Sequence, residues 1–232
     1  MKINYIDKII VCLLTFYLLI DSLNGFLLLG LGLDFKLSVI YKAIILILIS
    51  LALININANF LIWGIVLFIT LIIGEVTKIF LGLTAGAQLF FVVQHIFKLL
   101  TPLILFIYLK NLIKKDYRYI DKVKNILKIN CFVYLINILL GLLGFGFSTY
   151  GGDVNESSIG VKGFFYAGNE ISMLMVVFSA YLLGGTYKNN KLHYLFASLV
   201  WVIVGFAIST KTAMIATLIL VVFIPIIIER KA

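Results

Sequence analysis

Charged residues are scarce in this sequence, and that scarcity excludes a soluble globular domain. Asp, Glu, Lys and Arg make up 12% of the 232 residues, whereas 63% are hydrophobic. A soluble domain devotes about a quarter of its residues to charge. This chain cannot cover its surface in that way, so lipid has to surround it. We therefore predict an all-α, polytopic transmembrane helix bundle in which residues 1–232 form a single transmembrane domain.

Cysteine and the common catalytic motifs are nearly absent as well. The two cysteines, Cys12 and Cys131, lie inside apolar runs and lack metal-ligand spacing, which argues against a disulfide framework and a metal site. The sequence contains no H-E-x-x-H, no G-x-S-x-G and no phosphate-binding P-loop. A hydrolase has little support from these patterns, and we predict neither a metal nor a cofactor.

Long apolar runs fill most of the chain. A helix needs about 20 apolar residues to cross a bilayer, and eight segments of roughly that kind follow one another. Asp21 and Gly25 interrupt the first, while Pro102 and Pro225 fall inside two others, where we expect them to kink helices. The predicted spans are 9–31, 37–54, 60–74, 88–109, 126–145, 169–187, 194–208 and 212–228.

The basic residues predict the orientation of these spans. The net charge is +9, and seven of the basic residues lie in the segment 110–128. Lys and Arg concentrate in cytoplasmic loops, so this segment and both termini are predicted to be cytoplasmic, in a multi-pass protein of the cytoplasmic membrane. No basic region stands apart from the spans, and nucleic-acid binding is therefore not expected.

The longest predicted outer loop, 147–168, is rich in glycine, which lets a backbone turn sharply or approach a ligand closely. It leads into the segment K-G-F-F-Y-A-G-N-E at 162–170. Lys162 precedes a glycine-aromatic turn there. Asn169 is a suitable N-cap for the sixth span, and Glu170 in the first turn suits the helix dipole.

A second polar segment, S-T-K-T-A at 209–213, lies at the outer junction of the last two spans. Hydroxyls beside a lysine at a helix start form an anion site, which would include Ser209 and Lys211. The alternative is a lysine that extends to the membrane interface while the hydroxyls cap the last span. Together the two segments place Lys162 and Lys211 on one membrane face beside helix N-termini, an arrangement that suits a diphosphate.

The pairing of these two segments, one helical hairpin apart, resembles the O-antigen ligase and polysaccharide polymerase superfamily. In that family the basic residue of each segment is commonly arginine, whereas this chain has Lys162 and Lys211, which lack the bidentate guanidinium fork. Family members continue into a large extracytoplasmic loop and further helices. The resemblance therefore implies that this chain is an N-terminal portion of such a protein.

The resemblance also implies a glycosyltransferase-type reaction. An acceptor hydroxyl, on a glycan or a lipid, attacks the anomeric carbon of a sugar chain linked to undecaprenyl diphosphate, and the lipid diphosphate leaves. Lys162 and Lys211 would stabilise the leaving group. Asn169 would orient a glycan, and Glu170 is a candidate base. The expected partners are a lipid-linked oligosaccharide, its acceptor and the lipid bilayer.

Two other classes of protein stay open. Gln94, His95 and Lys98 fall within five residues of the fourth span. A lysine near mid-span usually faces the protein interior or a wet cavity, so Lys98 is a candidate substrate-binding residue of a transporter or flippase, with Asp21 or Glu75 as its acidic partner. A non-catalytic scaffold is the third class, suggested by the G-x-x-x-G spacing at 82–86.

Overall fold

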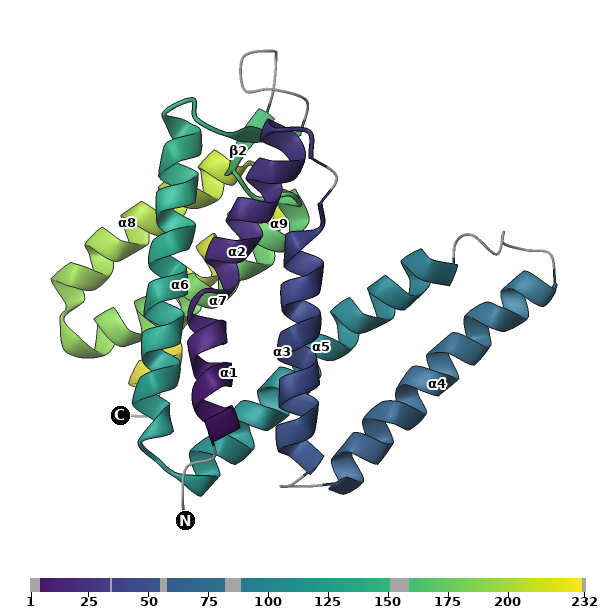
Figure 1. Ribbon diagram of the computed structural model, residues 1–232. Coiled ribbons are helices and arrows are strands. Elements are labelled where there is room, and N and C mark those ends of the chain that lie inside the picture. The colour runs from purple at the N-terminus through teal and green to yellow at the C-terminus, as the bar shows by residue number, and fades with distance from the viewer. Residues whose placement is uncertain (1–4, 34, 55–57, 82–88, 151–158, 231–232) are drawn as a thin grey trace. The chain divides into compact units, whose positions relative to one another are not determined.

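The computed structural model describes residues 5–33, 35–54, 58–81, 89–150 and 159–230 (Figure 1). Helices account for most of these residues, and one two-stranded sheet joins them. The chain divides into two compact units. The first consists of Met1–Leu14 and Val39–Ile126, and the second of Thr15–Ser38 and Leu127–Ala232.

The first unit is built from long apolar helices around a small core. Isoleucine and leucine side chains of its first two helices, among them Ile10 and Ile49, are almost completely buried. Pro102 lies inside its last full helix, as the sequence predicts. The helices of this unit are α1 (Tyr5–Thr15), α3 (Leu37–Ile54), α4 (Ala58–Phe80) and α5 (Leu89–Lys115).

The second unit contains the two-stranded sheet and the last three helices of the chain. The boundary between the units falls inside α6, so the residues of this helix from Leu127 onward belong to the second unit. Pro225 lies inside the last helix. The elements are α2 (Tyr17–Gly25), the π-helical turn η1 (Phe26–Gly30), α6 (Tyr119–Leu142), β1 (Phe147–Tyr150), β2 (Ile159–Gly163), α7 (Gly168–Asn189), α8 (Lys191–Ile208) and α9 (Lys211–Glu229).

Aromatic side chains form the core of the second unit. Tyr134 of α6 lies at its centre, where its ring contacts Phe165, Phe178 and Trp201 at centroid distances of 6.1, 5.6 and 6.3 Å. Its hydroxyl donates to the Ile171 carbonyl at 3.3 Å. Large buried aromatic rings contribute strongly to packing energy, so this cluster joins α6, α7 and α8.

The predicted spans coincide with helices, but eight membrane crossings are not confirmed. The bounds Leu37–Ile54 agree with the second predicted span, while the first is broken at Phe16 between α1 and α2. By length and composition, α3, α6, α7, α8 and α9 are able to cross a membrane. The bent pair of α1 with α2 and η1 makes a sixth if counted as one span. Neither α4 nor α5 passes this test over the described residues.

A strand pair lies within the segment 147–168, which the sequence predicts to be an outer loop. The strands β1 and β2 are antiparallel, with Ser148 opposite Val161 and Tyr150 opposite Ile159. Ser148 is completely buried, and Val161 belongs to the β-branched residues that favour strands. The loop is therefore partly an ordered hairpin that packs on the helices.

Candidate functional site

The end of the hairpin is fixed between α2 and α6. The Asn137 side-chain oxygen accepts hydrogen bonds from the Ser22 hydroxyl at 2.7 Å and from the Phe164 backbone N–H at 3.3 Å. Its amide group donates to the Val133 carbonyl at 3.1 Å. Asn137 is buried, and each of these bonds satisfies a polar group that would otherwise be costly to bury. The hairpin therefore has one fixed position on these helices.

Glycine allows the hairpin backbone to approach the helices this closely. Gly163 has a φ of +61°, and a Cβ placed on it would overlap the backbone carbonyl oxygen of Asn137. At Gly25 of α2, a Cβ would overlap the carbonyl oxygen of Phe164. At Gly163 the backbone closely approaches α6 of the same chain, whereas the sequence suggested a sharp turn or a close approach to a ligand.

The hairpin also contacts the connection between α8 and α9. Gly160 of β2 has a φ of +77°, and a Cβ on it would lie 2.8 Å from Ser209 Cβ and overlap the Ile208 carbonyl oxygen. Figure 1 shows β2 beside the end of α8. We call residues 159–168 together with 208–211 the hairpin corner. It unites the two polar segments that sequence analysis identified separately.

Lys162 lies in this corner and closes the turn after β2. Its ammonium group donates to the Tyr166 carbonyl at 3.3 Å, and the Phe165 N–H donates to the Lys162 carbonyl at 3.3 Å. The side chain is half-buried, and burial lowers the pKa of Lys162 below its ordinary value, because a charge is less stable away from water. A bound anion would oppose that shift.

Thr210 and Ser172 join the starts of α7 and α9. The Ser172 hydroxyl donates to the Gly168 carbonyl at 3.1 Å, so its contact with the Thr210 hydroxyl at 2.6 Å requires Thr210 to donate. Thr210 Oγ1 also accepts from the Ala213 N–H at 3.2 Å and caps α9. The capping alternative is therefore confirmed for Thr210.

Ser209 and Lys211 flank this cap and differ in what they contact. Ser209 ends α8 in the left-handed conformation, with a φ of 61°, and its hydroxyl donates to the Phe206 carbonyl at 2.8 Å. Lys211 is the first residue of α9 and is exposed. Among the described residues, no carboxylate pairs with Lys211 or with Lys162.

The N-cap prediction for Asn169 is wrong. The N-cap of α7 is Ala167, in an extended conformation and without a side-chain hydrogen bond, and Asn169 is the second residue of the helix. The helix begins at Gly168, which lies against Thr149 of β1, so that a Cβ at this position would be 2.9 Å from the threonine methyl group. Asn169 and Glu170 are both exposed, and Glu170 is in the first turn as predicted.

Chain geometry limits how far apart the two cations of the corner are. Gly160 contacts Ser209, and Lys162 and Lys211 are each two residues further along. Because a residue extends the chain by at most about 3.6 Å, the Cα atoms of the two lysines are within roughly 20 Å of each other. Two long, flexible side chains at this separation are able to converge on one polyanionic group.

Sequence analysis missed the polar residues that support the corner from within the helices. Asn137 and Ser172 carry out this role from α6 and α7. The only signal in the sequence is a polar residue inside an apolar run, a position where membrane helices use side-chain hydrogen bonds to contact other segments.

The mid-span cluster predicted for a transporter falls outside what the structure describes. Lys98 and His95 belong to α5, but their side chains are not among the described ones, and residues 82–86 are likewise outside the described ranges. Asp21 accepts a hydrogen bond from the Ser38 hydroxyl in the second unit. Over the described residues, no group of three or more His, Cys, Asp or Glu side chains is able to hold a metal ion.

The helices define the class of this protein: it is a multi-pass membrane protein with a bundle of α-helices and a small strand pair at one end of its second unit. No protein-family model, curated protein or solved structure matches the chain.

Proposed function

We propose that this protein takes part in bacterial surface polysaccharide assembly, where it transfers or polymerises undecaprenyl-diphosphate-linked glycan at the outer face of the cytoplasmic membrane. The observation that supports the proposal is the hairpin corner, because the contact between Gly160 and Ser209 unites the two cation-bearing segments. An enzyme that releases a lipid diphosphate requires positive charge near the departing oxygen atoms.

In the proposed reaction, four residues of the two polar segments each have a separate role. The acceptor hydroxyl forms a bond to the anomeric carbon, the bond from that carbon to the diphosphate breaks, and the electron pair remains on the diphosphate. Lys162 and Lys211 stabilise this charge. Glu170, exposed at the start of α7, receives the proton of the acceptor, and Asn169 beside it contacts the glycan.

Deletion of the gene tests the function at the level of the cell. Extracted surface glycans and lipid-linked intermediates are separated on a gel. A polymerase is indicated when long polymer disappears while single repeats accumulate on the lipid carrier. A ligase is indicated when polymer forms but stays on the carrier. If both pools match those of the wild type, the proposed function is wrong.

We expect Lys211→Ala in the full-length gene to reduce the polymer about a hundredfold, the loss seen when one preorganised group for a developing charge is removed. Lys211→Arg keeps the charge and should retain most activity. Lys124→Ala, on the predicted cytoplasmic side, is the matched control. Immunoblots of the membrane fraction establish equal abundance, and wild-type polymer from Lys211→Ala would refute the role of this lysine.

The predicted orientation has its own test. In a Cys12→Ser background, a cysteine at exposed position 211 should react with a membrane-impermeant maleimide in intact cells, because the corner is expected outside. A cysteine at position 124 should react only after the cells are permeabilised. Cys131 is buried, so the remaining native cysteine should not react and gives the background level of labelling. The reverse labelling pattern would place the corner in the cytoplasm, where the proposed reaction cannot occur.

A further inference from the structure

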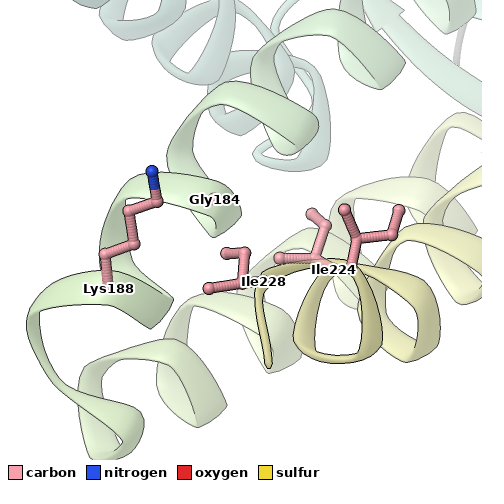
Figure 2. A pocket seen from close by; sticks show the side chains of 5 residues that line it. Gly184, Lys188, Ile224 and Ile228 are labelled. Carbon is pink, nitrogen blue, oxygen red and sulfur yellow. The ribbon is translucent and has the colours of Figure 1, made fainter. Parts of the chain in front are cut away.

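The second unit has a hollow at the end opposite the hairpin corner, between the last turns of α7 and α9. Its volume is about 250 Å³, and it is lined by Gly184, Lys188, Ile224, Ile227 and Ile228 (Figure 2). Pockets for drug-sized molecules usually exceed about 300 Å³. This hollow is smaller, and Lys188 is the one charged residue among those that line it.

The shape of the hollow comes from the spacing of two residues on α7. Gly184 and Lys188 are four residues apart, so they share one face of the helix. Gly184 has no side chain, and a Cβ built on it meets nothing within 4 Å. Figure 2 shows the Lys188 side chain extending along α7 on the side of Gly184, across from Ile224 and Ile228 of α9. The Lys188 side chain therefore lies beside an open hollow whose other lining residues are apolar.

The carboxylate at the end of α9 is already engaged by other residues. Glu229 accepts a hydrogen bond from the Tyr187 hydroxyl and pairs with Lys191 at 3.4 Å. Lys188 has no carboxylate partner among the described residues, and Arg230 nearby adds a second positive charge. Among the residues that line the hollow, Lys188 therefore supplies a positive charge that no carboxylate of the described residues neutralises.

We propose that this hollow binds one anionic phospholipid. An acyl chain lies along the three isoleucines of α9, and the phosphate contacts the Lys188 ammonium group. Basic residues near a membrane surface attract anionic lipids, and an apolar groove next to such a residue adds contact with the chain. This site is separate from the hairpin corner, so it stands whether or not the proposed function is correct.

Neighbouring glycines provide a matched test. Gly184→Leu places a side chain at the hollow, where a Cβ meets nothing within 4 Å. Gly185→Leu makes the same change at the next residue, where a Cβ also meets nothing within 4 Å but which does not line the hollow. Lys188→Gln removes the positive charge beside the hollow and leaves the volume of the hollow open. Lys128→Gln removes an exposed lysine from α6 and controls for the overall loss of charge.

The purified protein is incubated with phosphatidylglycerol or with phosphatidylcholine of the same acyl chains. Native mass spectrometry then counts the lipid molecules that the protein retains. The wild type and the Gly185→Leu and Lys128→Gln variants should retain one phosphatidylglycerol. Lys188→Gln should retain it about fivefold less, the contribution of one lysine near a membrane surface. Gly184→Leu should also retain less, because the new side chain takes up space in the hollow that the acyl chain needs. Retention of phosphatidylcholine equal to that of phosphatidylglycerol, or unchanged retention in Gly184→Leu, would overturn the proposal. Equal losses from Lys128→Gln and Lys188→Gln would also do so.

Discussion

Gly163→Ala should detach the hairpin from the helices and lower stability by about 2 to 5 kcal/mol, as the sum of two effects. The first is conformational. Gly163 has a φ of +61°, and an L-residue in that left-handed region costs about 1 to 2 kcal/mol. The second is steric, because the new methyl group would overlap the backbone carbonyl oxygen of Asn137. Overpacking of this kind costs about 1 to 3 kcal/mol.

The steric effect has consequences for the whole corner. To accommodate the methyl group, β2 has to move away from α6, and the Phe164 N–H then loses its bond to the Asn137 side chain. The edge contact between Phe164 and Phe26, with a centroid distance of 5.5 Å, would weaken as well. We therefore expect Lys162 to lose its fixed position beside the connection of α8 and α9.

Gly32→Ala is the control that separates the two effects. Gly32 has a φ of +65°, but a Cβ on it meets nothing within 4 Å. The Gly32→Ala substitution should therefore lower stability only by the conformational cost of about 1 to 2 kcal/mol. Thermal unfolding in detergent, followed by tryptophan fluorescence, should show a clearly lower midpoint for Gly163→Ala. Equal midpoints for the two variants would mean that the hairpin does not approach α6 as described.

The sequence predicts the helices well because their signal is local. A run of about 20 apolar residues forms a helix in lipid, since a helix satisfies the backbone polar groups within the segment itself. The segments Leu37–Ile54 and Lys191–Ile208 follow this rule. Hydropathy is a weaker guide to the number of membrane crossings. A helix can break within one apolar run, as between α1 and α2, while the run remains apolar on both sides of the break.

The candidate site is less predictable because its contacts are distant in sequence. The segments containing Lys162 and Lys211 stand out locally, and their juxtaposition follows from the contact between Gly160 and Ser209. The support from Asn137, by contrast, depends on a bond to a residue 27 positions away. The N-cap at Asn169 was misplaced because α7 begins at Gly168, beside Thr149 of β1, without a capping side chain.

Asp7→Ala should destabilise the first unit by about 3 to 5 kcal/mol, which is the usual result of removing one partner from a buried ion pair. Asp7 is 2% exposed and accepts hydrogen bonds from the Tyr108 hydroxyl at 2.9 Å and from the Lys115 ammonium group at 3.3 Å. The Lys115 side chain is only 15% exposed. Without Asp7, a largely buried cation and a buried hydroxyl lose their partner together, and α1 loses its polar link to α5.

An exposed pair in the same unit provides the comparison. Asp121 pairs with Lys124 at 3.2 Å, and both side chains are at least half exposed to solvent. Water replaces such a partner at little cost, so Asp121→Ala should change stability by less than about 1 kcal/mol. For a chain of this size, each kcal/mol shifts the unfolding midpoint by roughly 2 to 4 °C, which makes the two variants easy to distinguish. If Asp7→Ala unfolds at the same temperature as Asp121→Ala, Lys115 must find water or another partner, and the link between α1 and α5 does not depend on this charge.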